Sequence, residues 1–243
     1  MNIEEAHSRY LHQAAWTAPA RRHLLAAAGL ANARRVLEVG CGTGAVLAGL
    51  PQPVAGSLHG LDIDRAALAL AHQQAAQAQL SAGDAHQLPY SSNSFDIAFC
   101  HFVLLWLQDP AAGLAEMARV VRPGGAVLAL AEPDYSQRRD APPELVPVGR
   151  AQTAVLRARG ADPAIGGQLP ALFAQAGLQL IDAGALQASP PDAAAEAAIL
   201  FADLRFQLPG DELEAWLAQD AAAWAAGTRQ LHVPTYYALG RVP

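Results

Sequence analysis

A glycine-rich turn is the first feature of the chain that could do chemistry. The stretch VLEVGCGTGAVL (36–47) places Gly40, Gly42 and Gly44 directly behind an apolar run that predicts a buried strand. Glycine at such a turn permits positive φ angles and lets a ligand lie against bare backbone. By spacing alone the turn also fits a dinucleotide fingerprint, which tolerates alanine in its third position. The glycines therefore predict a nucleotide-like ligand without deciding which one.

Carboxylates accompany the predicted strand ends around this turn. Glu38 lies two positions before Gly40, where it would repel a pyrophosphate and attract a ligand that carries an ammonium and a sulfonium group. Asp62 follows the next strand, about 20 residues beyond the glycines, where a carboxylate can accept hydrogen bonds from ribose hydroxyls. Ile63 can lie flat on an adenine ring, and Asp84, after a third strand, can accept from the adenine amine. Together these residues favour S-adenosylmethionine over NAD.

The elements that must position these residues alternate between strands and helices. Predicted strands span residues 34–39, 56–64, 81–85, 95–103 and 126–132. Predicted helices span residues 44–50, which Pro51 and Pro53 would end, 65–80, which Asp64 can cap, and 110–121. Such alternation is typical of a doubly wound, parallel sheet.

Helical segments flank this alternation on both sides. Apolar residues recur at helical spacing over 10–30, and Pro19 divides this stretch into two predicted helices. Residues 134–160 are polar and proline-bearing, then weakly helical. Beyond them the pattern predicts a helix over 169–178, a strand over 179–186, helices near 192–206 and 211–226, and a last strand over 235–242.

Four segments carry a family resemblance: VLEVGCGTG (36–44), GLDIDRAALALA (60–71), AGDAHQLPYSSNSFDIAFC (82–100) and EMARVVRPGGAVLAL (116–130). In order and spacing they resemble the class I S-adenosylmethionine-dependent methyltransferases, in particular the small-molecule methyltransferase-domain branch. The resemblance implies an α/β, Rossmann-like, doubly wound seven-stranded sheet, mostly parallel with one antiparallel strand, here residues 235–242. It also implies a single methyltransferase domain over 1–243, with N-terminal lid helices (1–30), a cofactor-binding core (31–133) and helical substrate-lid segments that include the last sheet strands (134–243).

The resemblance assigns roles to particular residues of the core. Glu38, Gly40, Cys41, Gly42 and Gly44 would surround the methionine part of S-adenosylmethionine. Asp62 would bind the ribose, Ile63 the adenine face and Asp84 the adenine amine, while Ala85 would add a backbone contact and His101 would lie near the sulfonium. S-adenosylhomocysteine would be the product.

Methyl transfer from a sulfonium is an in-line displacement in which the protein mainly aligns the nucleophile and excludes water. A base is needed only if the acceptor must lose a proton, and the candidates near strand ends are His101, Glu132, Asp134 and Tyr135. The sequence EPDY (132–135) is similar to a motif of enzymes that methylate amide or base nitrogens. That motif belongs after the fourth strand, whereas EPDY follows the fifth, so this interpretation is rejected.

Acceptor recognition is expected outside the core. In such enzymes N-terminal helices fold over the cofactor, here with Arg9, Tyr10, Gln13 and Trp16. The predicted acceptor-binding residues are Tyr10, Trp16, Trp106 and Tyr135, with Phe201 and Trp216 as further aromatic candidates. Arg150, Arg157 and Arg159 could bind an acidic substrate, but a solvated helix face is the preferred interpretation.

Composition narrows the class of protein. The 243 residues carry a formal net charge of −6, and the basic residues, all arginine, are scattered, which argues against nucleic acid as a partner. Two cysteines make no disulfide framework or zinc site, and the dispersed histidines predict no metal site. A polar N-terminus and the lack of an apolar run of about 20 residues argue against a signal peptide and membrane insertion.

We therefore expect a cytoplasmic enzyme, monomeric or homodimeric, that methylates an oxygen or nitrogen of a small-molecule acceptor. Two alternatives stay open. One is a Rossmann-type NAD(P)-dependent reductase, which Glu38 disfavours. The other is a protein that binds the adenosyl cofactor without catalysis, in which the lid helices would mediate assembly.

Overall fold

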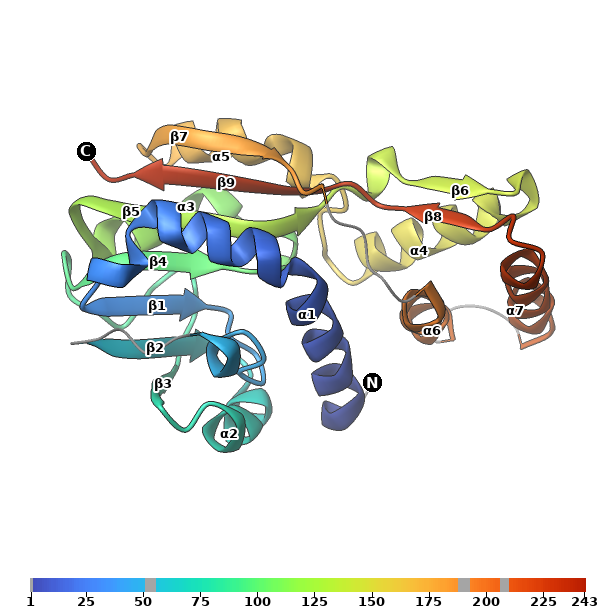
Figure 1. The fold of residues 1–243 in the computed structure, drawn as a ribbon, viewed down its shortest axis with the longest axis horizontal. Coiled ribbons are helices and arrows are strands. Elements are labelled where there is room, and N and C mark those ends of the chain that lie inside the picture. Colours follow the sequence, from blue (N-terminus) through green and yellow to red (C-terminus); the bar gives the residue numbers. More distant parts are fainter. Residues whose placement is uncertain (1, 51–55, 188–192, 206–209) are drawn as a thin grey trace.

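The computed structural model describes residues 2–50, 56–187, 193–205 and 210–243. A seven-stranded sheet runs through it in the order β3-β2-β1-β4-β5-β9-β7 (Figure 1). The strands are β1 (Arg35–Val39), β2 (Ser57–Asp62), β3 (Ala78–Ala82), β4 (Phe95–Cys100), β5 (Val121–Pro133), β7 (Gln179–Ala185) and β9 (Thr235–Arg241). Strand β9 runs antiparallel to both of its neighbours, and the pairs among β1 to β5 are parallel. The predicted sheet with one antiparallel strand is confirmed.

Helices cover both faces of the sheet, which is why its central strands are apolar on both sides. The helices are α1 (Ile3–Ala28), α2 (Arg65–Gln74), α3 (Pro110–Val120), α4 (Val146–Ala158), α5 (Leu169–Gln175), α6 (Ala193–Leu204) and α7 (Gly210–Ala225). On one face, Leu114 and Met117 of α3 and Phe173 of α5 pack in one core cluster. On the other, Leu25 of α1 and Leu68 of α2 belong to a second cluster. The sheet is therefore doubly wound.

The first helix differs from the predicted pair of helices. α1 begins at a capping box, in which the Asn2 side chain accepts from the Glu5 amide and the Glu5 carboxylate accepts from the Asn2 amide. It ends at Gly29, whose φ of 96° is left-handed. Pro19 lies inside this one helix, so the prediction of a break was wrong. Figure 1 shows that α1 bends along its course, as expected where proline removes one backbone donor. Packing of both halves against their neighbours keeps the helix continuous.

Two further boundaries were predicted wrongly. Residues 44–50 form turns and a short 3₁₀ segment, Leu47–Gly49, where an α-helix was expected; the expected stop at 51–53 lies outside the described residues. Helix α2 ends at Gln74, whereas the alanine-rich pattern predicted helix to 80. Pairing with β2 from Ala78 onward recruits this stretch into β3. Helix propensity in residues 75–80 is strong, but the backbone hydrogen bonds with β2 favour a strand from Ala78 onward.

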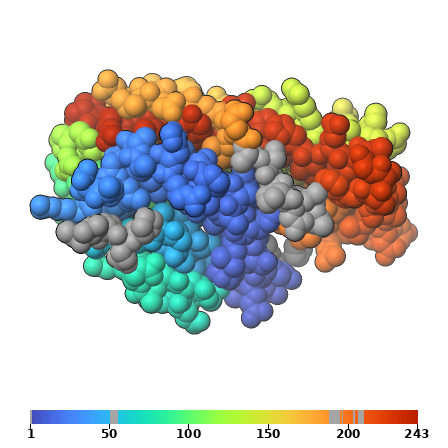
Figure 2. All heavy atoms as spheres, viewed as in Figure 1, coloured from blue at the N-terminus to red at the C-terminus, as the bar shows by residue number. Residues whose placement is uncertain are grey.

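A second group of elements, which we call the cap, comprises residues 138–158, 193–205 and 210–232. It contains α4, α6 and α7 together with a two-stranded antiparallel ribbon of β6 (Arg139–Ala141) and β8 (Gln230–His232), which the sequence did not predict. The cap has its own core cluster around Leu145, Phe201 and Leu204. In Figure 2 the dark blue α1 lies at the surface between the sheet and the orange and red parts of the cap. None of the helices in the described ranges is both long and apolar enough to cross a membrane.

Candidate functional site

A cavity of about 600 Å³ opens where β1, β2, β4 and β5 end, beneath the first half of α1. The sheet order changes direction between β1 and β4, and ligands of doubly wound sheets bind in the crevice at such a switch point. Predicted cofactor residues line this cavity, with the exception of Gly44: Glu38, Gly40, Cys41, Gly42, Asp62, Ile63, Asp84, Ala85 and His101.

The glycine turn forms the floor of the cavity. Gly40, Gly42 and Gly44 have φ angles of 73°, 51° and 79°, which explains the need for glycine. A Cβ atom on Gly40 would clash with the side chain of Val103, and one on Gly42 would lie 3.1 Å from the Tyr10 ring. Gly44 does not line the cavity, and a Cβ atom on it would lie 3.2 Å from Ala75 and 3.3 Å from Ala71, at the end of α2. Its role is therefore to hold the turn against α2.

Glu38 is the most unusual side chain in the wall. It is only 2% exposed, and its Oε2 atom has no hydrogen-bond partner. Burial raises the pKa of the Glu38 carboxyl well above its ordinary value, although the Arg21 guanidinium acts in the opposite direction. A buried acceptor without a partner is costly unless a ligand satisfies it. An ammonium group in the cavity would do so, which fits the amino group of S-adenosylmethionine.

Asp62 is placed by the end of β2 against the glycine turn. Its Oδ2 accepts a hydrogen bond from the Gly42 amide at 2.6 Å, and its Oδ1 accepts from the Asp64 amide at 2.9 Å. Each carboxylate oxygen has a second lone pair, so both can still accept from ribose hydroxyls. Ile63 next to it is 74% exposed, an apolar side chain on a cavity wall that suits the flat face of a base.

Asp84 is held by a residue that the sequence did not reveal. Its Oδ1 accepts two hydrogen bonds from His86, one from the amide and one from Nδ1, both at 2.8 Å. The Asp109 amide donates to Nε2 of the same ring at 3.3 Å, so the ring proton belongs on Nδ1. The His86 backbone amide contributes most to lowering the pKa of Asp84, followed by the ring. The spacing of two residues from Asp84 to His86 was the only available signal.

Helix α1 closes the cavity from above. His7 Nδ1 lies 2.8 Å from Thr43 Oγ1, and this contact ties the helix to the glycine turn. Tyr10 lines the cavity over Gly42, and burial raises its pKa. Of the predicted acceptor residues, Tyr10, Trp106 and Tyr135 line the cavity. Trp16 does not line it and faces a second, smaller chamber instead.

The arginines in α4 and at its C-cap are of two kinds. Arg150 and Arg157 are exposed, as expected for a solvated helix face. Arg159 is also exposed, but it lines the cavity, and its guanidinium lies 5.3 Å from the centre of the Trp106 ring. Arg159 therefore lies at the edge of the cavity, where it contacts both solvent and the cavity.

Burial weakens His101 as a base. Its Nε2 lies 2.9 Å from Thr17 Oγ1, and burial lowers its pKa to about 3, with a further contribution from the Arg21 guanidinium. A neutral imidazole with so low a pKa can accept a hydrogen bond, but it is a poor acceptor of a whole proton at neutral pH.

Two carboxylates that were considered as bases support backbone instead. Glu132 is fully buried and accepts from three consecutive amides, those of residues 103–105, which it holds beside the cavity. Burial raises the pKa of Glu132 to about 7. Asp134 accepts from the amide of Ser136 and from the Gln137 side chain. Tyr135 is the remaining candidate that lines the cavity. Within the described ranges, no group of three or more His, Cys, Asp or Glu residues could hold a metal ion.

Comparison with known proteins places this site in a family. Residues 37–129 match the family model described as a methyltransferase domain. The chain is 37% identical over 105 residues to a methyltransferase of Schizosaccharomyces pombe, covering 38% of each protein. It is 35% identical over 115 residues to the demethylmenaquinone methyltransferase of Staphylococcus epidermidis, covering 45% of this chain and 48% of that protein. The chain thus spans less than half the length of these curated relatives.

A solved structure extends the likeness beyond the matched segment at the level of fold. The geranyl diphosphate C-methyltransferase of Streptomyces coelicolor superposes with a TM-score of 0.60 at 11% identity, covering 93% of this chain and 79% of that one. The match of residues 37–129, the sheet order and the cavity at its switch point lead to one conclusion. The chain contains a class I S-adenosylmethionine-dependent methyltransferase domain.

Proposed function

We propose that this protein transfers a methyl group from S-adenosylmethionine to an oxygen or nitrogen atom of a small-molecule acceptor. One observation carries the proposal: the cavity has two chemically different walls. Carboxylates of Glu38, Asp62 and Asp84 stand on the side of β1 to β3. The side of β4, β5 and α4 is largely apolar, with Phe102, Leu105, Trp106, Leu107 and Leu156. A cationic adenosyl group suits the first wall and an organic acceptor the second.

The residues of the acidic wall have distinct tasks in this proposal. Glu38 binds the ammonium group, Asp62 the ribose hydroxyls and Asp84 the adenine amine. Bound S-adenosylmethionine supplies an electrophilic methyl group, so the protein has to provide alignment rather than activation of the donor. Helix α1 contributes by covering the glycine turn through Tyr10 and by excluding water.

The acceptor atom determines whether a base is required. A neutral amine can attack directly, whereas a phenol or alcohol must lose a proton. Tyr135 is the candidate for that base. His101, whose pKa burial lowers to about 3, is better suited to accept a hydrogen bond from the substrate that receives the methyl group. Carbon acids belong in the acceptor panel as well, because a solved structure of this fold is a C-methyltransferase.

The proposal is tested first by the ligand and then by turnover. Mass spectrometry of small molecules released from the purified protein, with calorimetry of S-adenosylhomocysteine and NADH, should find the adenosyl ligand bound and NADH not bound. Tight binding of NADH without S-adenosylhomocysteine would instead support the reductase alternative. Labelled S-adenosylmethionine is then offered with a panel of phenols, amines and carbon acids. Binding without methylation of any panel member would favour a non-catalytic cofactor-binding protein.

A further inference from the structure

A second chamber of about 50 Å³ adjoins the main cavity on the side of the cap. The two chambers share part of their walls, contributed by Arg9, Gln13, Phe102, Pro133 and Tyr135. Beyond these shared residues, the second chamber is lined by side chains from α1, α4, α6 and β8. A single water needs about 10–15 Å³ of such space, so this volume accommodates a small functional group of a larger molecule.

Phe102 is one of the residues that line both chambers. Its φ angle is 58°, a left-handed conformation that is uncommon for a residue with a side chain. Its ring lies edge-on to Trp16, with 6.2 Å between ring centres, and edge-on to His101, with 4.8 Å. Such backbone strain persists where surrounding contacts over-determine it, and it gathers at ligand sites. The contacts with Trp16 and His101 therefore hold Phe102 where the two chambers meet.

Trp16 gives the second chamber its chemical character. The side chain is only 9% exposed, and its Nε1–H group has no hydrogen-bond partner. Indole nitrogen is a donor only, and buried donors normally have a partner. Among the described residues that line this chamber, none carries a carboxylate. Trp16 thus brings to the lining of this chamber a buried donor without an acceptor.

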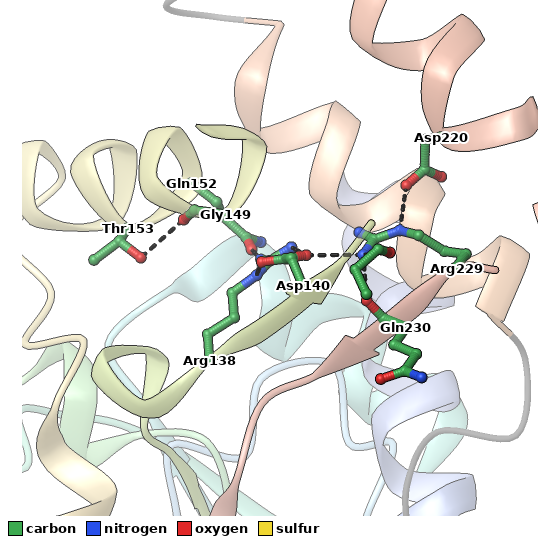
Figure 3. A network of polar contacts seen from close by, with 9 residues as sticks. Arg138, Asp140, Gly149, Gln152, Thr153, Asp220, Arg229 and Gln230 are labelled. Carbon is green, nitrogen blue, oxygen red and sulfur yellow. Dashed lines mark hydrogen bonds and ion pairs between the residues drawn. The ribbon is translucent and has the colours of Figure 1, made fainter. Parts of the chain in front are cut away.

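Hydrogen bonds hold another part of the chamber wall. Gln152 and Arg138 both line the chamber, and Arg138 donates to Gln152 and, at 2.6 Å, to Asp140 (Figure 3). These bonds belong to a buried network that joins α4 to the ribbon of β6 and β8. The chamber is consequently preformed, since both parts of its wall are held by contacts within the chain.

We infer that the second chamber is a subsite for the methyl acceptor and that it takes an oxygen-bearing group, a carbonyl or a carboxylate, which accepts a hydrogen bond from Trp16 Nε1. The inference rests on the proposed function, because it assumes that the main cavity holds the reacting end of the acceptor. The methyl acceptor is therefore a molecule with a nucleophilic atom at one end and, at the other, an oxygen that can accept a hydrogen bond.

The indole N–H signals of the protein in a ¹H–¹⁵N spectrum test this directly. The signal of Trp16 is assigned by its loss in Trp16→Phe, and that of Trp224 by its loss in Trp224→Phe. Trp224 is the matched control, because its Nε1 is also buried without a partner but lines neither chamber. Benzoate, benzamide and toluene are added as probes, each with and without saturating S-adenosylhomocysteine.

Benzoate or benzamide should shift the Trp16 signal downfield, because a new hydrogen bond deshields the proton. Toluene should not do so, and the Trp224 signal should not move. Trp16→Phe should weaken binding of the effective probe about fivefold, the equivalent of one neutral hydrogen bond, while Trp224→Phe leaves it unchanged. A response to benzoate alone identifies a carboxylate subsite, and a response to both probes identifies a carbonyl subsite.

A Trp16 signal that moves with neither oxygen-bearing probe overturns the inference and leaves the chamber as a site for ordered water. Unchanged probe affinity in Trp16→Phe overturns it as well. Failure of the proposed function looks different, because S-adenosylhomocysteine itself would then not bind. If it binds and Trp16 does not respond, only the subsite is lost.

Discussion

The acidic wall of the cavity and the buried network of the cap use charge in opposite ways. In the cap, Asp140 accepts from Arg138 at 2.6 Å and from Arg229 at 2.9 Å, and Arg229 donates to Asp220 at 2.6 Å (Figure 3). None of these four side chains is more than 4% exposed. Nη2 of Arg229 has no hydrogen-bond partner, but its guanidinium forms ion pairs with two aspartates. In the cavity, Glu38 is equally buried, one of its oxygens also has no partner, and Arg21 is the cation that acts on it.

This difference separates charges that hold the protein together from charges that await a ligand. A buried ion is expensive unless it is paired, so two arginines and two aspartates balance within the cap. The carboxylate of Glu38 lines the cavity and has Arg21 nearby, but one of its oxygens has no hydrogen-bond partner. Substitutions in the cap network should therefore reduce stability, while substitutions in the acidic wall should reduce ligand affinity.

The largest effect is expected at the centre of the network. Asp140→Asn removes the charge that Arg138 and Arg229 share, and breaking such a buried pair costs about 3–5 kcal/mol in the free energy of unfolding. Denaturant unfolding measures this loss. Arg122→Gln is the control, because it breaks a pair with an arginine that is 55% exposed, worth about 0–1 kcal/mol. Equal losses in the two variants would contradict the assignment of a structural role.

Asp62→Ala should give the largest effect on the ligand. The ribose hydroxyls lose a charged acceptor worth roughly 1.5–3 kcal/mol, so the Kd for S-adenosylhomocysteine should rise about 10- to 100-fold. Asp64→Ala is the neighbouring control: Asp64 caps α2 by accepting from the Ala66 and Ala67 amides. Its loss should cost about 1 kcal/mol of stability with little change in Kd. A cofactor affinity that is indifferent to Asp62→Ala would remove the ribose assignment.

Glu38→Gln should weaken S-adenosylhomocysteine binding about tenfold, because the amide oxygen still accepts from the ammonium but carries no charge. Calorimetry measures the loss. In the wild type, the affinity for S-adenosylhomocysteine should also rise as the pH increases from about 4.5, the ordinary pKa of a glutamate, toward the raised pKa of Glu38. The reason is that the ligand binds the ionised carboxylate. The same pH series should be flatter in Glu38→Gln. An identical pH dependence in both proteins would place the titration elsewhere.

Without ligand, Glu38 should have the opposite pH effect on the stability of the protein. The pKa of the Glu38 carboxyl is raised in the folded protein by burial, so the folded state binds the proton more tightly than the unfolded chain. The contribution of Glu38 to the free energy of unfolding therefore falls as pH rises from about 4.5 through the raised pKa. The difference between the wild type and Glu38→Gln isolates this contribution, since Glu132, whose pKa burial raises to about 7, titrates in both.

The smallest effect is expected at His86, which is partly exposed and acts through Asp84. His86→Ala should weaken S-adenosylhomocysteine binding about threefold, less than one full hydrogen bond to a charged group. The analogue S-inosylhomocysteine, which lacks the adenine amine, should bind the variant and the wild type alike. Equal weakening of both ligands would mean that His86 merely supports the loop.

The sequence predicted the features that depend on neighbouring residues and missed those that depend on contacts between distant parts of the chain. The strands of the seven-stranded sheet were predicted, the third of them three residues too late, and so were Glu38, Asp62 and Asp84, because apolar runs and turn glycines are local signals. The boundary at residue 78 was missed, since alanine-rich sequence favours helix until a neighbouring strand is present. The ribbon of β6 and β8 was missed because it pairs Arg139 with His232, far apart along the chain. The roles of Glu132 and His101 were open because only burial distinguishes a base from a structural group.

The sequence by itself determined the family and the predicted cofactor wall. Parallel strands place their carboxyl ends at one edge of the sheet, so residues that follow successive strands meet there whatever surrounds them. The tertiary structure alone decided what lies opposite that wall. Trp16, Phe102 and Arg138 come together around one chamber only because α1, β4 and the cap pack against each other. That packing depends on long-range burial and charge pairing, which leave no local pattern in the sequence.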